Sequence, residues 1–253
     1  MEAAELISKE ILAAKWGRQL LEPASERYEF GLVDAYVVQR RLLESRVAAG
    51  ERQVGWKIGY TSQAMREQMG VAEPNFGFLT DRMVLDSPAE LPPGCLQPRV
   101  EPEVAVVLAH EIRPSMSLAE IASSGHELRC ALEVVDPVWR DYRFTLRDNT
   151  ADGSSAAYAI LGPAISLDRD LAAINVVLSE GGKELATGST RAVMGHPLEA
   201  LRWLAGALAA QSLALKAGDL VLTGGITRAM PLRSGLEATF QGVGSVSVRW
   251  PTQ

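Results

Sequence analysis

The pattern of apolar and polar positions changes near residue 53. Before it, residues 2–20 and 34–49 carry apolar side chains at helical spacing, the second stretch starting at Asp34 as a candidate N-cap and ending at Gly50. After it, short runs rich in branched residues alternate with glycine and proline, which is typical of strands. We expect strands at 54–58, 83–85, 100–108, 131–135, 156–161, 175–179, 220–223, 236–240 and 245–250.

This pattern predicts an α+β protein in which a helical N-terminal portion, residues 1–52, precedes a β-rich domain, residues 53–253. One helix interrupts the second part: it opens at Pro197, a residue that is favoured in a first helical turn, and continues with leucines at helical spacing. His196 directly precedes this helix, and we interpret it as a cap or packing residue rather than a base.

Two of the predicted strands carry glutamates among apolar residues. Alternation of side chains along a strand puts Glu101 and Glu103 on the same face, and Glu133 repeats the arrangement about thirty residues later. Three converging carboxylates suit a hard divalent ion such as Mg²⁺ or Mn²⁺, which prefers oxygen ligands. The alternative is that these glutamates lie at strand ends and pair with arginines such as Arg99 or Arg129.

A lysine occupies the middle of the strand predicted at 54–58. Lys57 lies between two glycines, which suggests that another backbone approaches closely, and a buried lysine would need an anionic partner. The alternative is a surface lysine whose charged end reaches the solvent. The segments 76–81 and 150–155 are predicted to be polar turns, and the glycine pair after Thr223 could hold a carboxylate through its free backbone N–H groups.

Composition narrows the range of functions. The chain has 253 residues, 47% of them hydrophobic, and a net charge of −6 without a cluster of basic residues, which argues against a nucleic-acid partner. No apolar run reaches the length of a membrane span, and the N-terminus lacks the pattern of a secretion signal. Cys95 and Cys130 lie far apart, so we expect free thiols and a cytoplasmic protein.

Seven short motifs follow one another in a specific order. They are the residues 55–59 (GWKIG), 76–79 (FGFL), 97–104 (QPRVEPEV), 131–135 (ALEVV), 151–155 (ADGSS), 195–197 (GHP) and 222–227 (LTGGIT). Together they resemble the hydratase/decarboxylase family of aromatic meta-cleavage pathways, which belongs to the fumarylacetoacetate hydrolase superfamily. The likeness runs from about residue 30 to the end of the chain.

The resemblance implies a mixed β-roll fold of the fumarylacetoacetate hydrolase C-terminal-domain type, a Mg²⁺ or Mn²⁺ cofactor, and a short anionic 2-oxo or 2-hydroxy dienoic acid as substrate. It also implies a homo-oligomer and allows a complex with a partner hydratase. By position in the motifs, the residues implicated are Glu101, Glu103 and Glu133 as metal ligands, Lys57 as the active-site lysine that also contacts substrate, Asp81 as an acidic catalytic residue, and Ser155 and Thr223 as substrate-binding hydroxyls.

Two related activities share these motifs. The segment 224–231 and the Phe-Gly-Phe-Leu motif favour decarboxylation of 4-oxalocrotonate (2-oxo-3-hexenedioate) over hydration of 2-hydroxypenta-2,4-dienoate. Arg228 could pair with the second carboxylate of the decarboxylase substrate, whereas hydration needs an acid/base such as Asp81. A carbon–carbon bond hydrolase is a remoter alternative, because the N-terminal part contains no histidine that could activate water. A non-catalytic member that keeps the fold is another alternative.

The sequence departs from the family pattern in three places. Pro102 stands between the first two glutamates, and because proline has no N–H for the ladder we expect an edge strand or a bulge there. Gly153 replaces a common asparagine, and the turn at 234–236 lacks the usual Gly-Asp pair. The first two departures affect the expected substrate preference more than metal binding.

Overall fold

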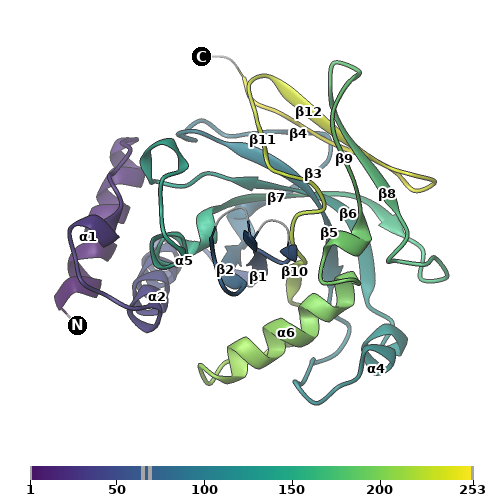
Figure 1. Ribbon diagram of the computed structural model, residues 1–253, viewed down its shortest axis with the longest axis horizontal. Coiled ribbons are helices and arrows are strands. Elements are labelled where there is room, and N and C mark those ends of the chain that lie inside the picture. Colours follow the sequence, from purple (N-terminus) through teal and green to yellow (C-terminus); the bar gives the residue numbers. More distant parts are fainter. Residues whose placement is uncertain (1, 64–65, 68–69, 252–253) are drawn as a thin grey trace.

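The computed structural model describes residues 2–63, 66–67 and 70–251. In this part of the chain, three helices, α1, α2 and α5, lie at one end of two curled β-sheets, and α6 and α4 lie below the sheets in Figure 1. The larger sheet has eight strands in the order β2-β1-β10-β5-β6-β7-β3, with β11 added beside β5. The smaller sheet has five strands in the order β4-β13-β12-β8-β9. The predicted α+β class is confirmed.

The elements have the following bounds. The helices are α1 (Glu2–Gly17), α2 (Leu32–Ala48), α4 (Leu118–Ser123), α5 (Leu146–Ala151) and α6 (Pro197–Ala209). The strands of the larger sheet are β1 (Gln53–Gly59), β2 (Asn75–Thr80), β3 (Val84–Asp86), β5 (Arg99–Val107), β6 (Glu127–Val135), β7 (Ala156–Ile165), β10 (Leu220–Leu222) and β11 (Met230–Pro231). Those of the smaller sheet are β4 (Ala89–Glu90), β8 (Asn175–Glu180), β9 (Lys183–Ser189), β12 (Gly235–Phe240) and β13 (Gly244–Arg249).

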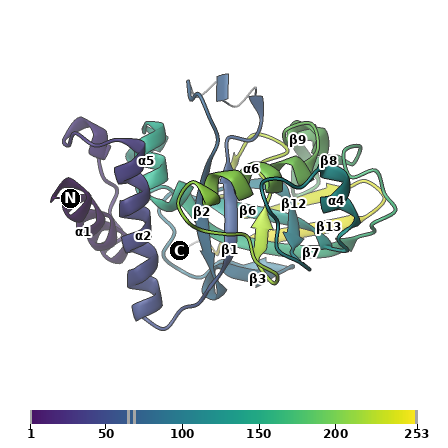
Figure 2. The same cartoon turned by 90° about the horizontal axis from the view of Figure 1, so that it is seen from below.

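The larger sheet is mixed. Strand β1 runs parallel to β10 and antiparallel to β2, while β5, β6 and β7 form an antiparallel run. Strand β5 is buried along seven of its nine residues, as its apolar faces predict. The helices α1 and α2 pack together beside α5 (Figure 2). The sheet therefore lies between the N-terminal helices and the smaller sheet.

Several predicted elements are confirmed. The predicted strands all overlap strands of the structure, and α6 begins at Pro197 with His196 as its cap, because the His196 Nδ1 accepts from the Leu198 N–H at 3.1 Å. Both cysteines are free thiols. Within the described ranges, every helix is too short or too polar to cross a membrane.

Two local predictions are wrong. Residues 76–81 are not a turn, since β2 covers Asn75–Thr80 and all six residues are buried. Helix α2 begins at Leu32 rather than Asp34: the Asp34 carboxylate lies inside the first turn and accepts from the Gly31 N–H at 2.9 Å, so the preceding glycine is the cap.

Pro102 also differs from its prediction. Strand β5 is central in the sheet, and its register with β6 continues without a shift across Pro102 and Leu132. On its other side β5 pairs with β10 at 105–107 and with β11 at 99–100. Pro102 faces the interval between these two strands, where the missing N–H breaks no ladder bond and its carbonyl accepts from the Ile226 N–H at 2.9 Å.

Candidate active site

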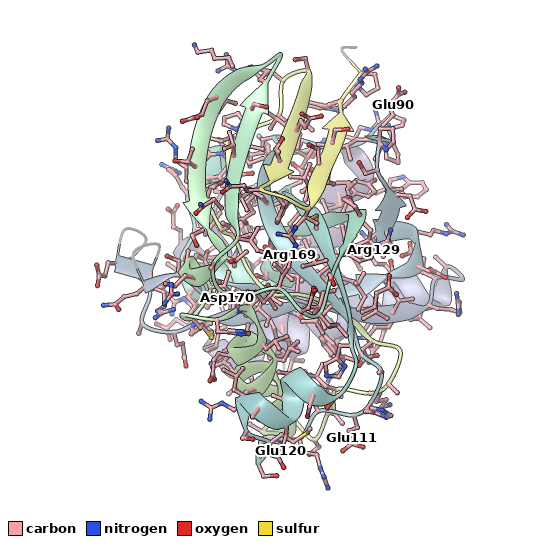
Figure 3. All side chains as sticks on the ribbon, turned by 90° about the vertical axis from the view of Figure 1, so that its right-hand side faces the viewer. Glu90, Glu111, Glu120, Arg129, Arg169 and Asp170 are labelled. Carbon is pink, nitrogen blue, oxygen red and sulfur yellow. The ribbon has the colours of Figure 1, made fainter. Side chains whose placement is uncertain are left out.

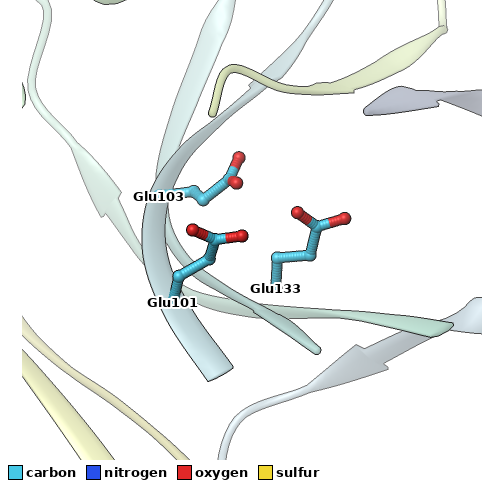
Figure 4. A group of neighbouring side chains, drawn as sticks. All are labelled: Glu101, Glu103 and Glu133. Atoms are coloured by element: carbon cyan, nitrogen blue, oxygen red, sulfur yellow. The ribbon is translucent and has the colours of Figure 1, made fainter. Parts of the chain in front are cut away.

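The three glutamates come together at the pairing of β5 with β6. In the ladder Glu101 lies directly opposite Glu133, and Glu103 lies two residues further along the same face. Each residue is buried, and one carboxylate oxygen from each lies within 4.8 Å of the others. Figure 4 shows the three carboxylates converging from the two strands. The structure therefore brings the predicted cluster together.

Two of these buried oxygens lack a partner among the described residues. One oxygen of Glu103 accepts from the Gly224 N–H at 2.7 Å, but its other oxygen has no hydrogen bond. Glu133 forms an ion pair through Oε1, described below, but its Oε2 has no partner. Burial, followed by the charge of Glu133, raises the pKa of Glu101 to about 7. Burial and the neighbouring carboxylates also raise the pKa of Glu103 well above its usual value. Buried anions without partners need a cation, so this donor set fits a hard divalent ion.

The arginine alternative is wrong. The Arg99 guanidinium stacks on the Tyr142 ring, 3.8 Å from its centroid. Arg129, labelled in Figure 3, lies 3.7 Å from Glu127 and donates to the Gly162 carbonyl at 2.9 Å. Neither arginine pairs with the three glutamates.

Lys57 is the cation that does face the cluster. Its side chain is 3% exposed, and its Nζ forms an ion pair with Glu133 Oε1 at 3.1 Å. The same ammonium donates to the Ser154 carbonyl at 2.9 Å and to the Ser154 hydroxyl at 3.2 Å. The flanking Gly55 is required because a Cβ there would lie 1.8 Å from the Leu220 carbonyl oxygen. The prediction of a buried lysine is confirmed, and the surface alternative is wrong.

The acceptor of Lys57 belongs to an unusual backbone segment. Gly153, Ser154 and Ser155 all have left-handed backbones, with φ of 69°, 54° and 58°. Side-chain amides hold the two serines: the Ser154 hydroxyl donates to Asn75 Oδ1 at 2.9 Å, and the Ser155 hydroxyl accepts from Asn149 Nδ2 at 2.7 Å. The sequence predicted only a polar turn here, whereas the structure shows a left-handed segment that is held by two asparagines and accepts hydrogen bonds from Lys57.

A cavity of about 600 Å³ opens beside the glutamates. Its lining residues come from the C-terminal ends of β1 and β6, from the N-terminal end of β5, from the residues between β6 and β7, and from β11 with the residues before it. They are Lys57, Gly59, Tyr60, Arg99, Glu101, Val135, Tyr142, Phe144, Asn149, Ser154, Ser155, Arg228, Ala229, Met230 and Pro231. Ser155 and Arg228 therefore lie where the sequence placed them. Tyr60, Asn149 and Ser154 were not predicted as site residues, although the polar residues that flank the Asp-Gly pair were a usable signal for Ser154.

Asp81 does not reach this cavity, which corrects its predicted place. It accepts from the Arg52 backbone N–H and Nε, both at 3.1 Å. In the ladder of β1 with β2, Lys57 lies opposite Gly77, whereas Asp81 follows the Thr80 end. At roughly 3.3 Å per residue, the backbone of Arg52, which holds Asp81, lies about 16 Å along the strand from the backbone of Lys57.

Thr223 directly precedes Gly224, which contacts the glutamate cluster, but the Thr223 side chain forms its hydrogen bond within the sheet. The Thr223 hydroxyl is fully buried and donates to the Val104 carbonyl at 3.0 Å. The next residue, Gly224, makes the contact with Glu103 through its backbone. The structure therefore replaces the predicted substrate contact of Thr223 with a role in joining β10 to β5.

Comparison with known proteins identifies the class of this fold and site. The chain belongs to the fumarylacetoacetate (FAA) hydrolase C-terminal family, which it matches over residues 56–249. It is 34% identical to 2-keto-4-pentenoate hydratase of Paraburkholderia phymatum over 249 residues, covering 96% of this chain and 95% of that protein. It is also 34% identical to 4-oxalocrotonate decarboxylase of a Pseudomonas species over 217 residues, 85% of each chain.

A solved structure is similar over almost the whole chain. It is 4-oxalocrotonate decarboxylase from Pseudomonas putida G7 complexed with magnesium and adipate, with a TM-score of 0.93, 30% identity, and coverage of 99% of this chain and 98% of that one. These comparisons confirm the resemblance to the hydratase/decarboxylase family and the predicted fold type.

Proposed function

We propose that the protein decarboxylates 4-oxalocrotonate (2-oxo-3-hexenedioate) to 2-hydroxypenta-2,4-dienoate, with Mg²⁺ or Mn²⁺ as cofactor. This reaction belongs to the meta-cleavage degradation of aromatic compounds. The proposal is supported by two decarboxylases among the similar proteins, one of them solved with magnesium and a six-carbon dicarboxylate.

The observation that carries the proposal is the placement of cations in the cavity. Lys57 lies beside the glutamates, while Arg99 and Arg228 line the same cavity near β11. Arg99 comes two residues before Glu101 on the same face of β5, on the side away from Glu103. Among the described residues, neither arginine forms an ion pair with a carboxylate. A dicarboxylate can therefore contact positive charge at each of its ends.

The roles of the side chains follow from this geometry. Glu101, Glu103 and Glu133 would hold the ion, which when bound supplies Lewis-acid attraction for the electrons released as the bond to the leaving carboxylate breaks. Lys57 adds a fixed positive charge where the 2-oxo end of the substrate accumulates negative charge. Ser155 orients the substrate through its hydroxyl.

Tyr60 completes the set as a proton source. Burial, followed by the charge of Glu101, raises the pKa of Tyr60, so its hydroxyl stays protonated at neutral pH. It lines the cavity and can donate a proton or a hydrogen bond to an oxygen that becomes negative.

The second candidate is hydration of 2-hydroxypenta-2,4-dienoate, because hydratases are as similar in sequence as decarboxylases. Hydration requires a group that delivers water and protonates a carbon. Asp81, the acid/base that the sequence suggested for this step, lies at the other end of its strand. This placement favours decarboxylation.

The test uses one metal-loaded preparation and both substrates. We expect CO₂ release from 2-oxo-3-hexenedioate with a kcat/KM at least about tenfold above that for hydration of 2-hydroxypenta-2,4-dienoate, a difference of about 1.4 kcal/mol in transition-state stabilisation. Faster hydration would overturn the assignment and leave the metal cluster unaffected. The cytoplasmic location, the homo-oligomer and the complex with a partner hydratase stay predictions.

A further inference from the structure

The segment that holds Lys57 has a conformation that its own residues disfavour. Ser154 and Ser155 carry Cβ atoms, and left-handed backbones are costly for such residues. Two in succession persist only where the surroundings hold them in place. Asn75 and Asn149 supply part of that support, and a second part comes from outside the cavity.

Asp152 provides the support from the residue before this segment. It is 1% exposed, and its two carboxylate oxygens are used separately. One oxygen accepts from the Val138 N–H at 2.9 Å, and the other forms an ion pair with the Nζ of Lys15 at 2.6 Å. Lys15 belongs to α1. The buried charge of Asp152, next to the segment 153–155, is therefore neutralised by the N-terminal helical portion.

Two further contacts join the same two regions. The Ser25 N–H and hydroxyl donate to the two oxygens of Asp148, at 2.8 and 2.6 Å. The Gln39 amide in α2 donates to the carbonyls of Phe76 and Thr150, both at 2.9 Å. Helices α1 and α2 and the short 3-10 helix Ala24–Glu26, which contains Ser25, therefore all contact the segment 148–152, and none of these contacts involves a residue that lines the cavity.

We propose that the N-terminal helical portion positions the active site, with Lys15 as the positioning residue that acts through Asp152. The ion pair fixes the carbonyl and hydroxyl of Ser154, and these in turn fix the ammonium of Lys57. The effect on turnover rests on the proposed function. The effect on the segment 148–155 does not.

The experiment compares Lys15→Met with the wild type by hydrogen–deuterium exchange and by steady-state kinetics. We expect exchange to rise in peptides covering 148–155 and to stay unchanged in β5 and β6. A displaced Ser154 should lower kcat by about tenfold to a hundredfold, with KM changed much less. The Mg²⁺ affinity should match that of the wild type, because Lys15 contacts none of the three glutamates.

Three other variants make the result specific. Lys15→Arg keeps the charge and should restore kcat towards the wild-type value. Lys9→Met removes a lysine of the same helix that pairs with exposed Glu5, and it should change nothing at 148–155. Asp152→Asn keeps an oxygen for the Val138 N–H without a buried charge, so it should loosen the segment even where Lys15→Met fails to fold.

Unchanged exchange at 148–155 in both Lys15→Met and Asp152→Asn would overturn the proposal. A local rise in exchange with an unchanged kcat would also overturn it, since the pair would then stabilise the segment without positioning Lys57. If the wild type lacks both candidate activities, the proposed function fails, while the exchange measurement still decides whether Lys15 holds the segment.

Discussion

At the scale of single residues, the site combines three buried carboxylates with one buried ammonium. Among the residues that the structure describes, Lys57 is the one cation paired with this cluster, through Glu133. Burying several like charges together is unfavourable without further positive charge. This excess of negative charge is the physical reason to expect a divalent ion. Removing the charge of any one glutamate should therefore lower the affinity for that ion.

Replacing Glu103 by glutamine should weaken Mg²⁺ binding. The change keeps the size of the side chain and removes its charge, so the protein should fold while the affinity falls by at least about tenfold to a hundredfold, the range seen even for residues that only support a ligand. Titration calorimetry measures the change, with Glu127→Gln on the outer end of β6 as the control. An unchanged affinity in Glu101→Gln, Glu103→Gln and Glu133→Gln would show that the glutamates are structural.

Lys57→Met should reduce catalysis more than binding of the metal. The variant keeps the length of the side chain but removes the charge beside Glu133. We therefore expect kcat/KM to fall, with a loss of transition-state stabilisation on the order of 2–5 kcal/mol. Kinetics at saturating Mg²⁺ measure the loss. Near wild-type values would contradict the role assigned to the ammonium.

Gly225→Ala tests how closely the backbone approaches the cluster. A Cβ at Gly225 would lie 2.1 Å from Glu101 Oε2, so the Glu101 carboxylate must leave its present position in the cluster. Since the displaced atom ends a flexible side chain, the fold should tolerate the change while the Mg²⁺ affinity falls. Gly206→Ala in α6 is the matched control, because a Cβ there meets nothing within 4 Å. Equal metal affinities in the two variants would refute the expected displacement.

At the scale of elements, the sequence predicted best where one strand contains its own signal. Strands β5 and β6 are apolar on both faces, and the alternation placed Glu101 and Glu103 on one side without knowledge of the fold. Strand β2 was missed because its Gly77 resembles a turn residue. The glycine is needed for packing instead, since a Cβ there would lie 2.1 Å from the Gly153 carbonyl oxygen.

The contact of α1 with the segment after α5 should show in the pH dependence of stability. Burial raises the pKa of Asp152 and Lys15 opposes this rise. Removing the ammonium should raise this pKa further. A carboxyl whose pKa is higher in the folded state stabilises the fold at low pH, and it loses that contribution as the pH rises through its folded pKa.

The free energy of unfolding of Lys15→Met, relative to the wild type, should therefore fall as the pH rises from about 4, near the unfolded pKa of an aspartate. Urea unfolding at several pH values measures it, and Lys15→Arg is the control. The other charged groups that act on Asp152 are Arg46 and Asp136, and both variants retain them. A loss independent of pH would exclude Asp152 as the titrating group.

At the scale of the whole molecule, the cavity is assembled from segments that lie far apart in the chain. Sequence order showed which motifs belong to the site, but it did not show which end of a strand faces it. Asp81 and Thr223 illustrate this. Asp81 follows β2 at the end away from the cavity, and the Thr223 hydroxyl donates to a backbone carbonyl inside the sheet. Asn75 and Asn149 support the site through pairings that no local pattern reveals.

The arginines of the cavity decide between a dicarboxylate and a monocarboxylate. Arg99 is half-buried and held on the face of Tyr142, whose hydroxyl in turn donates to backbone carbonyls. Arg228 is exposed, so its charge is screened by solvent. An arginine that is already oriented loses less entropy on binding a carboxylate, so Arg99 should contribute more of the affinity for the second carboxylate.

We therefore expect Arg99→Gln to weaken binding of adipate to the Mg²⁺-loaded protein by about tenfold or more, and Arg228→Gln to weaken it by less. Hexanoate has the same chain length with a single carboxylate, so its affinity should change little in either variant. Calorimetry with both ligands gives the comparison without any turnover. Equal losses for adipate and hexanoate would mean that Arg99 supports the shape of the cavity rather than a second carboxylate, and the case for a dicarboxylate substrate would then rest on Arg228 alone.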